Sequence, residues 1–400
     1  MRKAIRTLSL FVTVVVMTVV GYVGYLNLEL PDRFYVTGTE EFSMEQLPAV
    51  TAAEELPKES QAGVSTSRVL ETKLRLCGLI PIKTVNLQKV ETPYVVPCGT
   101  PFGLKMLTEG VVVVGLNPVE TEAGTICPAK EAGVRKGDVI LRAGGKAVSG
   151  NRELAEIVRA SEGKSVSLLL KRDGVELTLQ VVPVKAASDE VYRCGIWVRD
   201  SSAGIGTVTF YDPSTGVFGG LGHAVCDVDT GGVMPLAEGQ VVPVSIHGVQ
   251  KGEAGTPGEL QGSFLTTLSC GELRKNTETG VYGVLNRNPA AGREAIPICL
   301  RQEVKEGPVQ ILTTISGTEP ALYDAVIEKV SLGDHTPTKN LILRITDPEL
   351  LSKTGGIVQG MSGSPILQDG KLAGAVTHVF VNDPTRGYGI FAENMLDAAR

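Results

Sequence analysis

The sequence lacks the features that mark several large protein classes. Its 400 residues include only four histidines and one tryptophan. Seven cysteines are scattered without a C-x-x-C pair, so they give no metal signature, and an odd number cannot all pair within one chain. No block of Lys and Arg occurs, and the net charge of -6 argues against nucleic acid as the main partner. Neither a metal nor an organic cofactor is expected.

Glycine, in contrast, is abundant, with 47 residues. After residue 190, short runs rich in Val, Ile, Thr and Tyr are bounded almost everywhere by Gly, Pro, Asn or Asp, and helical periodicity is scarce. Short strands with frequent turns are typical of a barrel or a sandwich. The fold class is therefore expected to be mainly β, in two or three domains.

One long apolar run stands at the N-terminus. Residues 7–26 carry no charge, follow Arg2, Lys3 and Arg6, and are numerous enough to span a bilayer. The run lacks the small-residue cleavage site of a secretory signal peptide, which favours an uncleaved anchor at residues 1–28. The basic flank is expected to stay in the cytosol, with the rest of the chain on the far side of the membrane.

Residues 29–94 are interpreted as a linker with a small structured part. The segment 48–59 is polar and contains prolines, so we expect it to be flexible. Residues 78–89 alternate more regularly between apolar and polar side chains and are expected to form a strand pair.

Residues 95–184 have a pattern of their own. The most specific part is Ala-Gly-Val-Arg-Lys-Gly-Asp-Val-Ile-Leu at 132–141, which follows a strand pattern at 110–115. Apolar residues at helical spacing come next, and a hairpin around Asp173-Gly174 closes the segment. The whole segment resembles a PDZ domain.

The PDZ resemblance implies a binding loop and a peptide partner. Phe102, Gly103 and Leu104 stand where the family's carboxylate-binding loop belongs, and the next strand would accept a peptide as an added strand. The alternative is a PDZ groove that a segment of the same chain already fills.

A loop with several glycines at residues 355–365, GGIVQGMSGSP, carries two serines. Its glycines permit turns that aim consecutive N–H groups at one point, as an oxyanion hole requires. Met361 stands where a phosphate loop needs lysine, and the closing glycine of an α/β-hydrolase elbow is missing. A plain polar turn is the simplest alternative. The loop resembles the Gly-Asp-Ser-Gly-Gly-Pro loop of trypsin-like serine proteases, with Ser362 as nucleophile.

A serine nucleophile needs a base, and the candidates are His223, His247, His335 and His378. His223 follows glycines, as Ser362 does. The other three lie at the end of an apolar strand pattern, in a turn pattern and in the strand pattern after the serine. The residues alone leave the choice open, because a triad is recognised by its geometry.

Residues 197–223 and 354–365 together resemble the stage IV sporulation protein B peptidases, and the resemblance extends over the anchor and the PDZ segment. It implies that His223 and Ser362 are catalytic, and that the N–H groups of Ser362 and Gly360 form the oxyanion hole. It also implies that the C-terminal part, from residue 185 to residue 400, is a trypsin-like double β-barrel.

The third member of the triad has competing candidates. The resemblance implies Asp347 as the residue that orients the imidazole. The same stretch also has the pattern of a short capped helix, with Asp347 as N-cap, Pro348 at the first position and Gly355 after the end. Asp227 and Asp229, which follow His223, are the alternatives.

The family resemblance implies a membrane-anchored serine endopeptidase of sporulation. Such peptidases cross the inner forespore membrane, cleave themselves, and cut a membrane-embedded regulatory complex in the intermembrane space. The cut releases an intramembrane protease that processes a sigma factor. Expected partners are membrane-bound protein substrates, other copies of the chain and a PDZ-bound peptide. The competing hypotheses are a PDZ-based adaptor with an inactive serine-protease-like domain and an esterase.

Overall fold

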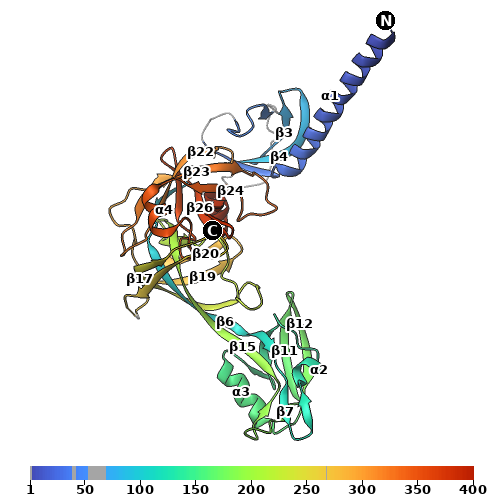
Figure 1. The fold of residues 1–400 in the computed structure, drawn as a ribbon, viewed down its shortest axis with the longest axis vertical. Helices are drawn as coiled ribbons and strands as arrows, with labels where there is room; N and C mark the ends of the chain where they lie inside the picture. The colour runs from blue at the N-terminus through green and yellow to red at the C-terminus, as the bar shows by residue number, and fades with distance from the viewer. Residues whose placement is uncertain (1, 38–41, 53–68, 267) are drawn as a thin grey trace, which may run out of the picture.

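The computed structural model describes residues 2–37, 42–52, 69–266 and 268–400. Its architecture is mainly β (Figure 1). Figure 1 shows four parts along one axis: an N-terminal helix, a small sheet, a pair of barrels and a PDZ domain at the far end.

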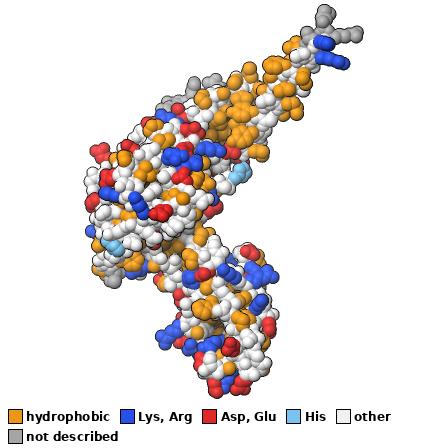
Figure 2. Space-filling model, in the orientation of Figure 1, with side chains coloured by type: hydrophobic (Ala, Val, Ile, Leu, Met, Phe, Trp, Pro, Cys, Tyr) orange, Lys and Arg blue, Asp and Glu red, His pale blue; other side chains and the backbone are white. Residues whose placement is uncertain are grey.

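The N-terminal helix α1 (Arg2–Glu29) extends away from the other parts (Figure 1). Its segment Ile5–Glu29 has a mean hydropathy of 2.0 and is long and apolar enough to cross a membrane. Large apolar side chains such as Leu10, Phe11 and Met17 are more than half exposed along it, and Figure 2 shows hydrophobic side chains covering its surface. The helix is therefore compatible with a single-pass membrane anchor.

A four-stranded sheet follows the helix, in the order β1-β4-β3-β2. Its strands are β1 (Arg33–Thr37), β2 (Val50–Ala52), β3 (Val69–Leu76) and β4 (Ile80–Val90). Residues 78–89, expected to form a strand pair, instead lie mostly within one strand, β4, which pairs with both β3 and β1. Of the segment expected to be flexible, 48–59, only residues up to 52 are described, and they include β2.

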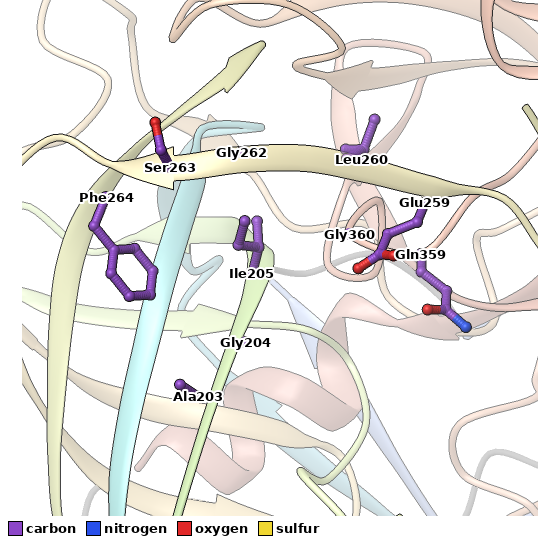
Figure 3. Close-up of a pocket in the computed structure, with 10 residues that line it drawn as sticks. All are labelled: Ala203, Gly204, Ile205, Glu259, Leu260, Gly262, Ser263, Phe264, Gln359 and Gly360. Atoms are coloured by element: carbon purple, nitrogen blue, oxygen red, sulfur yellow. The ribbon is translucent and has the colours of Figure 1, made fainter. Parts of the chain in front are cut away.

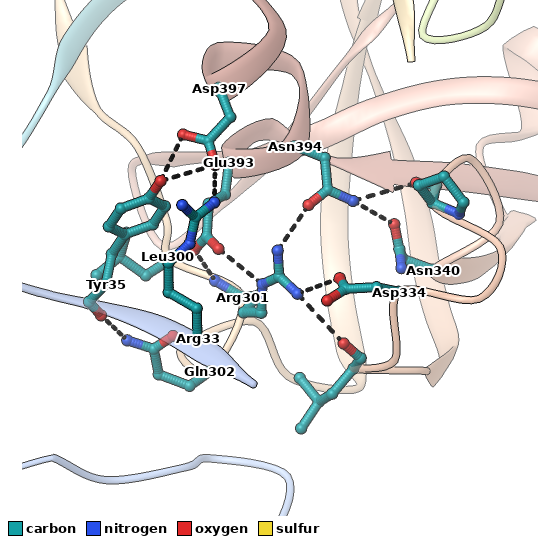
Figure 4. A network of polar contacts seen from close by, with 12 residues as sticks. Arg33, Tyr35, Leu300, Arg301, Gln302, Asp334, Asn340, Glu393, Asn394 and Asp397 are labelled. Atoms are coloured by element: carbon teal, nitrogen blue, oxygen red, sulfur yellow. Dashed lines mark hydrogen bonds and ion pairs between the residues drawn. The ribbon is translucent and has the colours of Figure 1, made fainter. Parts of the chain in front are cut away.

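A polar network fastens this sheet to the C-terminal helix α5 (Ala392–Ala399), as Figure 4 shows. The Tyr35 hydroxyl donates to Asp397 at 2.8 Å. Arg301, 7% exposed, donates through Nε to Glu393 at 2.7 Å. Breaking a buried pair of this kind typically costs about 3 to 5 kcal/mol, because it leaves a charge unpaired. That pair lies within the barrel part; the bonds that attach the sheet to it include that of Tyr35 to Asp397 and that of Gln302 Nε2 to the Tyr35 carbonyl, at 2.6 Å.

The first barrel closes through long strands. The pairings lead from β6 through β17, β19, β20 and β16 to β15, and β15 pairs back with β6. The strands of this region are β5 (Tyr94–Pro97), β6 (Pro101–Leu116), β15 (Ile196–Tyr211), β16 (Val217–Gly220), β17 (Leu236–Gln250), β18 (Glu259–Phe264), β19 (Gly271–Thr277), β20 (Gly280–Leu285) and β21 (Ile296–Pro297). A cluster with Phe102, Val208 and Phe218 fills the interior.

The PDZ domain is inserted between β6 and β15. The far ends of these two strands pair with each other, and β6 also pairs with β9. Its other elements are β7 (Val119–Thr121), β8 (Gly124–Ile126), α2 (Pro128–Glu131), β9 (Val139–Ala143), β10 (Lys146–Ala147), α3 (Asn151–Ala160), β11 (Val166–Arg172), β12 (Val175–Val181), β13 (Val184–Lys185) and β14 (Tyr192–Arg193). It has a separate core, with Ile140, Leu168 and Leu170 fully buried.

The second barrel closes with strands of its own, in the order β22-β23-β24-β27-β26-β25. Its elements are β22 (Gly307–Thr313), β23 (Ala321–Val330), β24 (Leu341–Ile345), α4 (Pro348–Thr354), β25 (Pro365–Gln368), β26 (Lys371–Phe380) and β27 (Asp383–Phe391). An apolar cluster that includes Phe210 and Tyr282 of the first barrel and Ile390 of the second joins the two. The domain boundaries expected from the sequence, before residue 95 and before residue 185, each fall within a paired strand. These strands are β5 (Tyr94–Pro97) and β13 (Val184–Lys185).

Candidate active site

The serine loop lies where the two barrels meet. It begins after α4, which ends at Gly355 in a left-handed conformation (φ 75°). Thr207 of β15 holds the loop from the first barrel: its N–H donates to the Ser362 carbonyl at 3.0 Å, and its Oγ1 donates to the Gly360 carbonyl at 2.9 Å. Thr209 adds a bond to the Gly363 carbonyl at 2.7 Å.

The glycines of this loop are required by its geometry. Gly360 and Gly363 have φ values of 95° and 94°, which L side chains rarely adopt. A Cβ on Gly363 would also overlap the Thr207 carbonyl oxygen and the Leu221 backbone. The second serine, Ser364, is buried and donates to the Met361 carbonyl at 2.6 Å, so it supports the turn and is not available for attack.

Between Gly360 and Ser364, two backbone N–H groups have no acceptor within the described chain. Those of Met361, Gly363 and Ser364 donate to the carbonyls of nearby residues, but those of Gly360 and Ser362 do not. This is the arrangement that an oxyanion hole needs, because its donors must be free to bind developing negative charge.

The Ser362 hydroxyl donates to the carbonyl of Thr377 on β26 at 2.7 Å. Its proton therefore points at the wall of the second barrel. Attack on a substrate would require the hydroxyl to rotate away from this carbonyl.

His223 lies in the loop after β16, where Leu221 and Gly222 both have positive φ. Its Nδ1 lies 2.8 Å from the Ala224 carbonyl oxygen. A carbonyl oxygen only accepts, so Nδ1 carries the proton and Nε2 keeps a lone pair, which is the tautomer of a general base. Burial lowers the pKa of His223, and the bond to Ala224 opposes part of this shift.

The loops of Ser362 and His223 meet on the same part of β26. Gly222 packs so closely on Thr377 that a Cβ on the glycine would lie 2.9 Å from Thr377 Cγ2. The His223 ring lies 4.8 Å from the ring of His378, the residue after Thr377. The structure thus brings the two candidates to one place, although no hydrogen bond joins them in the described chain.

His378 is the residue near the site that the sequence analysis did not select. The residue as a whole is exposed, but the pKa of His378 is lowered to about 4, mainly because its imidazole ring is partly buried. The nearby charges of His223 and Lys339 contribute smaller parts of this shift. In the sequence, only its position in the strand pattern after Ser362 indicated that His378 could lie near the site. His247 is exposed on β17, and the His335 Nε2 lies 3.3 Å from the Leu28 carbonyl.

None of the three candidate acids contacts His223 in the described chain. Asp347 accepts from the Leu350 N–H at 2.9 Å and is the N-cap of α4. Asp227 is buried and forms an ion pair with Arg199, which also binds Asp229 at 2.8 Å. The structure therefore gives each carboxylate a structural partner, and Asp347 as the triad acid stays a prediction.

Phe102, Gly103 and Leu104 do not lie in a loop. They are within β6, where Gly103 pairs with Ile205 of β15 and Val242 of β17. Phe102 and Leu104 are buried in the core of the first barrel. This corrects the expected loop: the apolar alternation of these residues suits a barrel strand as well as a PDZ strand. Peptide binding by the PDZ domain stays a prediction.

A groove of about 510 Å³ lies beside the serine loop (Figure 3). Its walls come from β15, β18 and the residues just before Met361. Figure 3 shows Glu259 and Gln359 near each other at the end next to Gly360, and the Phe264 ring at the other end. The lining residues are Ala203, Gly204, Ile205, Glu259, Leu260, Gly262, Ser263, Phe264, Gln359 and Gly360.

Comparison with known proteins agrees with this geometry. The model of the SpoIVB peptidase S55 family matches residues 190–396, and that of the PDZ domain matches residues 102–182. Among solved structures, the chain is similar to the PDZ domain of the SdrC-like protein from Listeria monocytogenes, at 19% identity and a TM-score of 0.19. That similarity covers 22% of this chain and 87% of the other.

Proposed function

Because the chain belongs to the SpoIVB peptidase S55 family and is a serine peptidase, we propose that it acts at a membrane, cleaves itself and cuts a membrane-bound regulatory complex to trigger sigma-factor processing during sporulation. The meeting of the Ser362 and His223 loops at Thr377 and His378 carries the catalytic part of this proposal. Helix α1 supports the membrane part.

The chemistry is acyl transfer. The Ser362 hydroxyl turns from the Thr377 carbonyl toward His223, whose Nε2 takes the proton as Oγ attacks a peptide carbonyl. The N–H groups of Ser362 and Gly360 stabilise the oxyanion, and one such donor is typically worth about 3 to 4 kcal/mol. His223 then gives the proton to the leaving amine, and water hydrolyses the acyl-enzyme.

The location of the reaction follows from the anchor. Arg2, Lys3 and Arg6 precede the apolar helix, and by the positive-inside rule they support an N-terminus in the forespore cytosol. The barrels and the PDZ domain then lie in the intermembrane space. An anchor raises the effective concentration of the enzyme near anchored substrates, including other copies of itself.

Labelling with a fluorophosphonate tests the catalytic part. We expect the full-length chain in detergent to be labelled, and Ser362→Ala and His223→Ala to lose the label. An internal control is Ser364→Ala, which removes the buried serine next to the site. An unlabelled wild-type protein would favour the adaptor hypothesis.

Mixing tests the self-cleavage. Full-length Ser362→Ala protein, incubated with the wild-type enzyme in the same micelles, should be cut into fragments visible on a gel, whereas Ser362→Ala alone should stay intact. If both stay intact and the wild-type protein incubated alone also gives no fragments, the proposed self-cleavage is wrong, even when labelling has succeeded.

A further inference from the structure

The groove beside Gly360 has an open strand edge along its floor. β15 pairs with β6 on one side from Ile196 to Thr207, and its pairing with β16 on the other side begins only at Val208. On the other side, the Thr207 N–H reaches the Ser362 carbonyl. Because successive residues of a strand alternate, the backbone groups of Ile205 and Ala203 point to this same open side.

The position of His223 decides which part of a substrate lies here. A base that protonates the leaving amine must be next to the segment that follows the cleaved bond. Besides Gln359 and Gly360 of the serine loop, the walls of the groove are β15 and β18 of the first barrel, which also carries His223, whereas β26 of the second barrel contacts Ser362 through Thr377. The groove therefore suits the segment on the carboxyl side of the bond.

The direction of that segment follows as well. It leaves Ser362 next to Thr207 and then passes Ile205 and Ala203, so it runs against the direction of β15. An extended peptide in this position forms an antiparallel strand pair, with the amide of its second residue after the bond facing Ile205.

Glu259 is the only charged side chain among the residues that line the groove. Glu259 is exposed at the end beside Gly360, and the lining includes no cation. Ile205 and Phe264 supply apolar surface. Gly262 lets Ile205 pack against β18, because a Cβ on the glycine would meet Ile205 Cδ1 at 3.0 Å. Beyond the far end, the Lys105 Nζ lies 5.0 Å from the centre of the Phe264 ring.

We propose that this groove binds the substrate segment that follows the cleaved bond, as an extended strand on β15, and that its side chains set a sequence preference. Glu259 selects a basic residue close to the bond, and the apolar wall with Phe264 selects an apolar residue beside it. The proposal rests on the proposed peptidase function and names the class of substrate: an extended, basic and apolar polypeptide segment.

A peptide library made by digesting a proteome tests the preference. Full-length wild-type protein in detergent is expected to release products enriched in Lys or Arg within the first two residues after the cut. Glu259→Lys should change the ratio of basic to acidic residues there by about tenfold in favour of acidic ones, and Phe264→Ala should weaken the apolar preference by a similar factor. Mass spectrometry of the new ends gives both readouts.

Glu306→Lys is the matched control, because Glu306 is exposed on the second barrel and lies outside the groove. It makes the same change of charge and should keep the wild-type preference. Fluorophosphonate labelling is measured for every variant to establish that Ser362 is reactive.

Methylated peptides give a readout without any substitution in the enzyme. A peptide that the wild-type protein cuts well should be cut about tenfold more slowly when the amide of the second residue after the bond is N-methylated, because it then cannot donate to Ile205. Methylation of the third residue, whose N–H points away from β15, should have a smaller effect.

The outcomes separate this inference from the peptidase function. Labelled wild-type protein that cuts library peptides without a preference for basic residues after the cut, or a Glu259→Lys variant that is labelled and keeps the wild-type preference, overturns the inference and leaves the peptidase in place. Equal effects of the two methylations also overturn it. Wild-type protein that is not labelled overturns both.

Discussion

The two barrels close in different ways and hold different halves of the candidate site. The second barrel closes with six strands of its own and carries Ser362. The first barrel carries His223 and closes through β6 and β15, which continue into the PDZ domain. The candidate nucleophile thus belongs to a self-contained unit, while the candidate base belongs to a unit that shares its strands with the PDZ domain. Because Thr207 and Thr209 of β15 also bond the serine loop, a distortion of the PDZ domain carried along β15 would reach both halves of the candidate site.

The largest expected effect on stability and labelling comes from a substitution at the contact between the two barrels. Gly363→Ala puts a Cβ against Thr207 and Leu221 and strains a φ of 94°, so we expect a loss of about 3 kcal/mol or more in stability and a strong loss of fluorophosphonate labelling. Thermal unfolding and labelling rates measure the two effects.

Gly370→Ala is the matched control. Gly370 also has a positive φ, of 77°, but its Cβ would meet no atom within 4 Å. It should cost only about 1 kcal/mol and keep the labelling rate. Equal losses in the two variants would mean that the close contact between the barrels is not what holds the serine loop.

The pH dependence of labelling examines the first-barrel half of the site. The base must be neutral, and burial lowers the pKa of His223 from its ordinary value of 6.5. The labelling rate should be constant above pH 6.5 and fall about tenfold per pH unit once the pH is below the lowered pKa. Because the folded pKa lies below the unfolded one, stability from the neutral ring is also lost as the pH falls through it.

The pH at which the labelling rate is half its maximum distinguishes two possible environments of His223. A midpoint below pH 6.5 fits a histidine bonded only to the Ala224 carbonyl. A midpoint above pH 6.5 would instead indicate a carboxylate close to the ring, because an opposite charge favours the protonated form. His378, with its pKa near 4, stays neutral over this range.

The smallest expected effect is that of a substitution in the second barrel, at Asp347. Asp347→Asn keeps a side-chain oxygen for the Leu350 N–H but removes the charge, so it should cost less than about 1 kcal/mol and leave the labelling rate nearly unchanged. A triad acid replaced in the same way loses about 10⁴-fold in rate. Such a loss, in a variant with normal thermal stability, would assign Asp347 to the triad.

The sequence predicted the parts of this molecule that local pattern determines. The glycines around Ser362 predicted a sharp turn, and the short strands predicted a mainly β fold of the barrel or sandwich type; both are confirmed, and the two barrels are those that the family resemblance implied. The pattern could not show where β6 pairs, because an apolar strand such as the one with Phe102 and Leu104 fits a barrel and a PDZ domain equally well. The hydrogen bond between His223 and the Ala224 carbonyl could not be predicted from the sequence either, because every residue has a backbone carbonyl.

β15 joins the two functional regions without a hinge. At about 3.3 Å per residue, the stretch from Ile196 in the PDZ domain to Thr207 beside Ser362 is about 36 Å long. The stretch pairs with β6 at both ends, with register shifts after Trp197 and after Arg199, so about 36 Å is the upper limit of this separation. A substrate tethered at the PDZ domain would therefore be cut within a limited distance of its tether, as well as at a preferred sequence.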